Sequence, residues 1–340
     1  MRPVVWMSDP SLHSLGEKIA SGGGTPIAKA GTTVSSLEEF IRATRNERTI
    51  SFVDAGTLPE LARVGATLPS AIIGIATDTL ASAVAWLQPY PWLSHVVSAS
   101  TFDHPMASWH FENLIATFNA DAKPRLLDWL GPEVAGRRIR LAKSNKRADR
   151  LERMGDFLDS KGVGSRTITQ LRDSAEELLT NAFYDAPVSA GAFKDPISRT
   201  LEVTLPDNLA CDLAYGCRDD LAIVRVKDPF GSLTRKRLTE VLMRCSRTDM
   251  GVEVDESMGG AGLGMWKVFS SASFVAISVV AHRHTEILVG VAKRAPGQRP
   301  FAFHLFFYDG AKPRSWTALN EDPVRAATLN NSVLLAVKAR

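Results

Sequence analysis

The stretch from Gly259 to Phe269 reads GGAGLGMWKVF and places four glycines within six residues, directly before an apolar helical pattern. Glycine has no Cβ, so a backbone rich in glycine can approach a ligand closely. The amides at the start of the following helix, together with the helix dipole, favour an anion such as a phosphate. We therefore predict that residues 259–264 form a phosphate-binding turn.

The residues on either side of these glycines exclude two familiar nucleotide-binding motifs. The preceding segment 246–258, SRTDMGVEVDESM, is polar and loop-like, whereas a dinucleotide-binding fold needs a strand directly before its glycines. A P-loop needs Lys followed by Ser or Thr after its last glycine, and here Met265-Trp266 follows Gly264.

A second motif precedes the glycines in the chain. Residues 222–226 (AIVRV) are typical of a buried strand, and Asp228-Pro229-Phe230-Gly231 follows as a turn. A carboxylate at a strand end can accept a hydrogen bond from an exocyclic amine, which would select adenine over guanine. Taken alone, the same residues also fit a plain type I turn with proline at its second position.

A third motif lies in the helical pattern TITQLRDSAEELLTNAF at 167–183. Glu177 and Asn181 are four residues apart, so their side chains lie on one helix face. The amide oxygen of Asn181 can ligate a divalent cation while the carboxylate of Glu177 takes a proton nearby. Taken alone, such a pair is more often a solvated surface pair.

In this order the three motifs resemble the GHKL ATPase superfamily over residues 136–310. The resemblance implies a Bergerat α/β sandwich that binds ATP and Mg²⁺, with Glu177 as general base, Asn181 as Mg²⁺ ligand and Asp228 as the adenine-binding acid. Gly231 matches the first glycine box of the family. The second, phosphate-contacting box is matched by Gly260, Gly262, Leu263 and Gly264.

The arrangement of this half is closest to the anti-sigma-factor serine kinases of that superfamily. A strand (RRIRLAK, 137–143) and a helix (145–161) precede the helix that carries Asn181, and no histidine lies between Arg137 and Glu177. The resemblance therefore implies a Ser/Thr kinase acting on a partner protein in a signalling pathway, and not a kinase that phosphorylates its own histidine. The alternative is a non-catalytic adaptor whose docking depends on bound nucleotide.

The first 120 residues predict a doubly wound parallel sheet. Apolar runs at 3–7, 49–53, 71–76 and 94–98, with a weaker one at 26–28, alternate with helical patterns. Ligands of such sheets bind beyond the carboxyl ends of the strands. Three polar residues fall there: Asp9, Asp54 and Thr77.

This half resembles a degenerate response-regulator receiver domain. By that resemblance Asp54 stands at the phospho-acceptor position, accompanied by Asp9 and Thr77. Ser8-Asp9 stands where receivers have two acids, and Ser98–Thr101 stands where they have a lysine, so the resemblance implies a docking domain that regulates the second half. The alternative is that both acids cap ordinary turns.

Composition places the chain among ordinary globular proteins. Its 340 residues predict two domains, 1–120 and 137–310, with a linker at 121–136 and an extension at 311–340. Because 40 basic residues nearly balance 37 acidic ones, a nucleic-acid partner is not expected, and we predict that the basic stretch 137–153 is a solvated face. With three cysteines and no apolar run long enough to cross a bilayer, we expect a cytoplasmic protein without a membrane partner. The resemblance also allows a homodimer.

Overall fold

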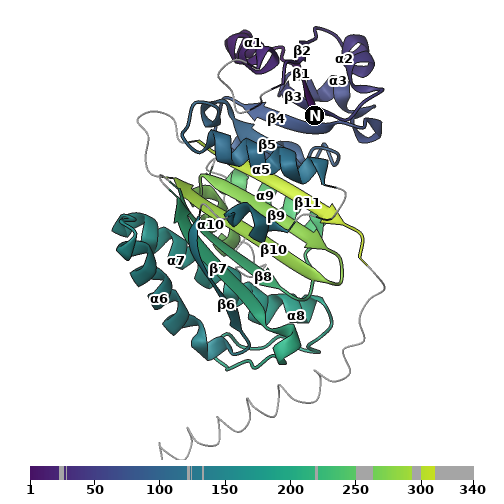
Figure 1. Cartoon of the computed structure of the whole chain (residues 1–340). Coiled ribbons are helices and arrows are strands. Elements are labelled where there is room, and N and C mark those ends of the chain that lie inside the picture. Colours follow the sequence, from purple (N-terminus) through teal and green to yellow (C-terminus); the bar gives the residue numbers. More distant parts are fainter. Residues whose placement is uncertain are drawn as a thin grey trace, which may run out of the picture.

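The computed structural model describes residues 1–22, 27, 29–120, 123, 125–131, 134–218, 221–249, 263–292 and 300–310. Its described strands form one mixed sheet of eleven strands in the order β2-β1-β3-β4-β5-β11-β9-β10-β8-β7-β6 (Figure 1). The strands are β1 (Arg2–Trp6), β2 (Thr32–Thr33), β3 (Thr49–Asp54), β4 (Ala71–Ala76), β5 (His95–Ser98), β6 (Ala135–Leu141), β7 (Cys211–Arg218), β8 (Leu221–Asp228), β9 (Phe274–Val280), β10 (His284–Ala292) and β11 (Ala302–Tyr308).

Helices cover both faces of this sheet. The α-helices are α1 (His13–Ser21), α2 (Leu37–Thr44), α3 (Leu58–Leu61), α4 (Leu80–Val84), α5 (Ala107–Asn119), α6 (Arg147–Ser160), α7 (Ser165–Thr180), α8 (Ala186–Ser189), α9 (Arg235–Asp249) and α10 (Leu263–Ser271). The 3-10 helices are η1 (Pro10–Leu12), η2 (Gly65–Thr67), η3 (Ala85–Leu87), η4 (Ala99–Thr101), η5 (Leu126–Leu130), η6 (Ser144–Lys146) and η8 (Asp207–Leu209), and η7 (Asn181–Asp185) is a π-helix.

The first five strands are all parallel and lie in the order 2-1-3-4-5, which is a doubly wound order. The expected strand at 26–28 lies outside the described residues except for Ile27, and the strand observed beside β1 is β2 at Thr32–Thr33. The two β-branched threonines of β2 suit an edge position.

The second half builds an antiparallel sheet with helices packed against one face. The strands β6, β7, β8, β10 and β9 pair antiparallel in that order, and β11 adds parallel to β9. Along β8, Val224 and Val226 point into the core that α7 covers, while Ile223 points into a second core on the opposite face. The buried residues of α7 recur at helical spacing, at Ile168, Leu171, Ala175, Leu178 and Leu179.

The two halves share the sheet instead of forming two separate ones. β11 lies between them, parallel to β9 on one side and antiparallel to β5 on the other. Because β11 covers the outer edge of β5, all four residues of β5 are buried. The fold is therefore mixed α/β with one continuous sheet, and a separation into two domains is not confirmed.

The segment expected to be a linker contributes to the core where it is described. Residues 126–130 form η5, whose Leu126 and Trp129 are buried in the second core. The carbonyl oxygen of Trp129 accepts a hydrogen bond from the indole of Trp109 on α5 at 3.0 Å. This segment thus covers the face of the sheet that α7 leaves open.

Candidate functional site

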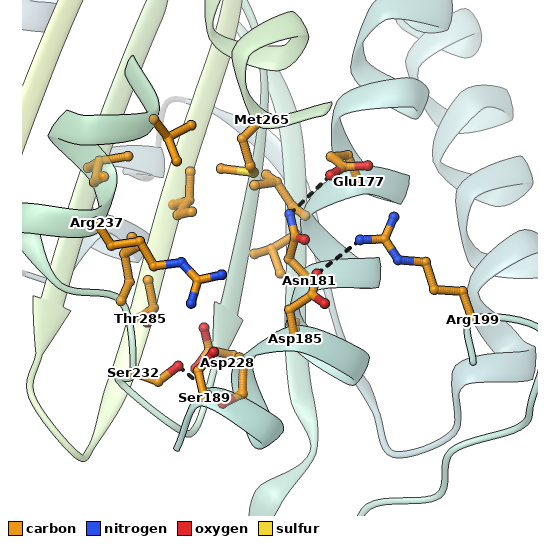
Figure 2. Close-up of a pocket in the computed structure, with 18 residues that line it drawn as sticks. Glu177, Asn181, Asp185, Ser189, Arg199, Asp228, Ser232, Arg237, Met265 and Thr285 are labelled. Atoms are coloured by element: carbon orange, nitrogen blue, oxygen red, sulfur yellow. Dashed lines mark hydrogen bonds and ion pairs between the residues drawn. The ribbon is translucent and has the colours of Figure 1, made fainter. Parts of the chain in front are cut away.

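A pocket lies between α7 with η7 on one side and α9 on the other, with β8 and β10 beneath it (Figure 2). Its volume of about 160 Å³ is roughly ten times what one enclosed water requires, so it can take a ligand group of many atoms. Its lining residues are Glu177, Leu178, Asn181, Ala182, Asp185, Ala186, Ser189, Arg199, Val226, Asp228, Ser232, Leu233, Arg237, Leu238, Val241, Met265, Thr285 and Ile287.

Asp228 ends β8 at the floor of this pocket and is only 8% exposed. Its Oδ1 accepts hydrogen bonds from the amides of Phe230 at 2.8 Å and Gly231 at 3.2 Å, and Thr285 on the neighbouring strand also hydrogen bonds to the carboxylate. Burial raises the pKa of the Asp228 carboxyl to about 6, although these hydrogen bonds act in the opposite direction. At neutral pH the group is therefore a buried hydrogen-bond acceptor.

Gly231 shapes the turn after Asp228 and does not itself line the pocket. Its φ of +61° lies in the left-handed region, and a Cβ there would lie 2.3 Å from the carbonyl oxygen of Val280. Its carbonyl accepts from the amide of His282 at 3.1 Å, which ties the turn to the β9–β10 connection. Only glycine suits this position, and Phe230 beside it is fully buried in the core.

Glu177 and Asn181 lie on the opposite wall, one turn apart. The Asn181 amide nitrogen donates to Glu177 Oε1 at 3.3 Å (Figure 2). This hydrogen bond uses the nitrogen, so the amide oxygen is the Asn181 atom suited to a cation. At Asn181 the α-helix passes into the π-helix η7, a rare feature that occurs frequently at functional sites.

Gly264, in the first turn of α10, packs directly against Glu177. A Cβ at Gly264 would lie 2.3 Å from the Glu177 carboxylate carbon, so a larger residue would displace that carboxylate. The carboxylate therefore lies between the Asn181 helix and the start of α10. Gly260 and Gly262 lie outside the described residues, and of Leu263 only the backbone is described.

Several charged and polar residues at the pocket were not predicted from the sequence. Arg199 donates to Asp185 at 3.0 Å at one side of the pocket. The side chain of Arg237 extends from α9 into the pocket (Figure 2). The Ser232 hydroxyl donates to the carbonyl of Ala186 at 3.1 Å. These residues come from loops and helix ends far apart in the chain, and no local spacing marks them.

The acids of the first half have their own local partners. Asp54 is 2% exposed, and its carboxylate accepts from the amides of Ser8, Asp9 and Thr57 at 2.7, 2.6 and 3.1 Å. Asp9 caps η1 by accepting from the amide of Ser11 at 2.9 Å, and Thr77 is exposed after β4. These contacts favour the alternative in which both acids cap turns. Phosphorylation of Asp54 stays a prediction.

The basic stretch 137–153 lies on the edge strand β6 and on α6. Arg138 pairs with Asp212 at 2.7 Å, Arg147 with Glu176 at 3.2 Å, and Arg153 with Asp149 at 3.2 Å. These three ion pairs neutralise part of the positive charge of the stretch with acidic residues of the same chain. Arg138 and Arg153 are 58% and 61% exposed, as expected for a solvated face, whereas the Arg147 side chain is only 14% exposed.

The chemistry of the lining residues fits an adenine nucleotide with a divalent cation. Asp228 offers a buried acceptor among apolar side chains, including Val226 and Ile287, that can contact a planar ring. Asn181 offers an amide oxygen that can ligate Mg²⁺, and the carboxylate of Glu177 beside it can take a proton. The absence of a Cβ at Gly264 lets the Glu177 carboxylate lie against the start of α10 at the same wall.

No membrane-spanning segment belongs to the described part of the chain, since none of its helices is long and apolar enough to cross a bilayer. In the same part, no group of three or more His, Cys, Asp and Glu side chains is arranged to hold a metal ion. A cation in the pocket would therefore depend on ligand atoms from the bound molecule as well.

No protein-family model matches the chain. No curated protein sequence matches it either. Among solved structures, it is similar to a chain in the crystal structure of the SiaB-SiaC complex from Pseudomonas aeruginosa, with a TM-score of 0.34 and 11% identity, over 54% of this chain and 99% of the other.

Proposed function

We propose that this chain binds ATP with Mg²⁺ in the pocket and transfers the γ-phosphoryl group to a Ser or Thr of a partner protein in a signalling pathway. The proposal includes a GHKL-type fold for residues 137–310, preceded by a receiver-like half. One observation carries it. Asp228 and the Glu177–Asn181 pair are separate in sequence, yet they line a single pocket from opposite sides.

The adenine end of the site is Asp228. Its buried carboxylate accepts a hydrogen bond from the exocyclic amine of adenine, while guanine presents a carbonyl oxygen at that place. Two acceptors facing each other in a buried pocket repel, and the guanine carbonyl oxygen is left without a donor, so guanine nucleotides are disfavoured. The apolar walls at Val226, Leu238 and Ile287 exclude water from the ring faces.

The phosphate end of the site is the wall formed by Asn181, Glu177 and the start of α10. The Asn181 amide oxygen would hold Mg²⁺, which when bound neutralises phosphate charge and orients the phosphates. Glu177 is placed beside Asn181 to accept the proton of the attacking hydroxyl. The exposed guanidinium of Arg237 adds positive charge to the pocket for an anionic ligand.

Calorimetric titration of the full chain with Mg-ATP, Mg-ADP and Mg-GTP tests the binding step. We expect micromolar or tighter binding of the two adenine nucleotides and at least about fivefold weaker binding of Mg-GTP, because one buried mismatched polar contact costs about 1–3 kcal/mol. Asp228→Asn should weaken Mg-ATP binding, whereas Asp173→Asn, at an exposed acid on α7, should not. No heat at millimolar Mg-ATP and Mg-ADP would end the proposal.

Phosphoryl transfer is tested separately from binding. The chain is incubated with γ-labelled ATP and the proteins that co-purify with it, and the label is mapped to its residue. We expect label on a partner Ser or Thr with the wild type, and its loss in Glu177→Gln while Mg-ADP affinity is retained. Nucleotide-dependent co-purification without any label would contradict the kinase step and favour the adaptor.

A further inference from the structure

Helix α9 belongs to the pocket and also packs on the first half of the chain. Its residues Arg237, Leu238 and Val241 line the pocket. On its other side α9 packs against α4 and η3, and its buried Leu242 lies in the same core as Val84 and Leu87. A wall of the pocket is therefore in direct contact with the N-terminal half.

Arg235, the first residue of α9, anchors this contact. Its guanidinium donates to the Ser94 hydroxyl at 3.0 Å, to the Leu93 carbonyl at 2.5 Å and to the Leu87 carbonyl at 3.4 Å. All three acceptors lie in the segment 87–94, which joins η3 to β5 in the first half. An arginine suits this task because its planar fork presents several donors at fixed angles.

The start of α9 is fixed on its other side by the turn that follows the adenine-binding acid. The Asp228 carboxylate accepts hydrogen bonds from the amides of Phe230 and Gly231. Three residues after Gly231, the Thr234 hydroxyl accepts from the amide of Arg237 at 3.3 Å. The first turn of α9 therefore lies between two anchors, the Asp228 turn and the segment 87–94. Arg237 and Leu238 project into the pocket from that same turn.

We propose that Arg235 is a positioning residue that couples the N-terminal half to nucleotide binding by fixing α9 as a wall of the pocket. A conformational change in segment 87–94 would move the first turn of α9 and so change the affinity for nucleotide. By linkage, bound nucleotide must stabilise segment 87–94 to the same extent. This inference rests on the proposed nucleotide site.

The test compares Mg-ADP affinities of full-length variants by calorimetry. Arg235→Ala should weaken binding between about fivefold and 150-fold, the usual range of coupling between sites. Arg235→Lys should restore part of the affinity. Ser94→Ala should lose less than Arg235→Ala because it removes one acceptor of three. Lys236→Ala, the neighbouring exposed residue on the same helix, is the matched control and should bind as the wild type does.

Two further measurements separate positioning from general destabilisation. Hydrogen exchange should show that Mg-ADP protects segment 87–94 in the wild type but not in Arg235→Ala, while Asp228 and Asn181 segments are protected in both. The double variant Arg235→Ala with Ser94→Ala should equal Arg235→Ala alone, since Ser94 acts through Arg235. If Arg235→Ala does not fold, Ser94→Ala and Arg235→Lys carry the same comparison.

The outcomes distinguish the two proposals. A wild type that binds no adenine nucleotide overturns the proposed function and this inference with it. A wild type that binds Mg-ADP, with Arg235→Ala, Arg235→Lys and Ser94→Ala binding equally well and segment 87–94 unprotected, overturns only the coupling.

Discussion

The carboxylate of Asp228, the proposed adenine acceptor, is buried at a cost to the stability of the fold. Burial raises the pKa of its carboxyl to about 6, compared with an ordinary value of 3.8. The folded chain therefore binds this proton more tightly than the unfolded chain does. The stability that this group contributes is fully present below pH 3.8 and is lost as the pH rises through 6, so at neutral pH the buried charge costs on the order of 3 kcal/mol.

We predict that Asp228→Asn stabilises the ligand-free chain at pH 7.5, by about 1–3 kcal/mol in the free energy of unfolding, because it removes a buried charge. The gain should shrink at pH 5, where the wild-type carboxyl is protonated. Urea unfolding at both pH values measures this. A variant that is less stable at pH 7.5 would show that the hydrogen bonds of Phe230 and Gly231 require the charged form.

Gly264 gives a prediction about geometry instead of charge. An added Cβ would meet the Glu177 carboxylate, so Gly264→Ala should displace that group and break its hydrogen bond with Asn181. We expect phosphoryl transfer or ATP turnover to fall at least about tenfold, equivalent to about 1.4 kcal/mol of transition-state stabilisation.

The matched control for Gly264 is Gly155→Ala on α6. There the new Cβ would lie an ordinary 3.4 Å from Arg172 Cδ, so activity should be unchanged. Stability should rise by about 0.5–1 kcal/mol, since alanine is the better helix former. Equal turnover in Gly264→Ala and the wild type would remove Glu177 from the proposed chemistry.

Three buried histidines lie at the junction formed by β5, β11 and α5. His304 on β11 lies between the other two, with 3.2 Å between its Nδ1 and that of His95 and 2.7 Å between its Nε2 and that of His110. Burial lowers the pKa of His95 and of His110 to about 3 and that of His304 well below its usual value, and the charge of Arg235 lowers the pKa of His95 further. The junction thus requires uncharged imidazoles.

The stability that these histidines contribute is present above pH 6.5 and is lost as the pH falls toward 3, because the unfolded chain then binds protons that the folded chain excludes. We predict that His110→Gln reduces the stability lost between pH 7 and pH 5 by about 2 kcal/mol. Chemical unfolding at the two pH values measures this, with His13→Gln, at an exposed position on α1, as control. Identical losses in all three chains would contradict the role given to His110.

At the level of elements, the sequence predicted most strands of the first half, because alternation and apolar periodicity are local properties. In the second half it predicted β6 and β8 but not the strands β7, β9, β10 and β11. The expected helix 145–161 is observed as α6 at Arg147–Ser160, and the strand 71–76 is observed as β4. The π-helix at Asn181 was not predicted, since no residue pattern distinguishes it from the helix it continues. The spacing of Glu177 and Asn181 did predict that their side chains lie on one helix face, and in the structure they hydrogen bond there.

Pairings between strands that lie far apart in the chain could not be predicted from the sequence. About two hundred residues separate β5 from its partner β11 in the chain. The apolar pattern of a buried strand does not indicate which neighbouring strand it pairs with. Likewise Arg199 and Arg237 reach the pocket from segments whose spacing is irregular. The motifs singled out Asp228 and Asn181, which both line the pocket, but not Arg199 and Arg237.

At the level of the whole molecule, the shared sheet implies shared cooperativity. One hydrophobic core contains Val4 and Val96 of the first half together with Leu179 and Val289 of the second, so neither half buries its apolar surface alone. We predict a single calorimetric transition in which the van't Hoff and calorimetric enthalpies agree. Two resolved transitions would show that the halves unfold independently in spite of the β5–β11 pairing.

Strand β11 has a consequence for how the chain is made. It lies in the interior of the sheet, yet Ala302–Tyr308 is the last of the described strands to leave the ribosome. Until then β5 and β9 each present an open, apolar edge, and such edges recruit other strands. A truncated chain that ends before Ala302 keeps both edges open and is therefore prone to aggregate. Only a chain synthesised as far as Tyr308 can complete the continuous sheet.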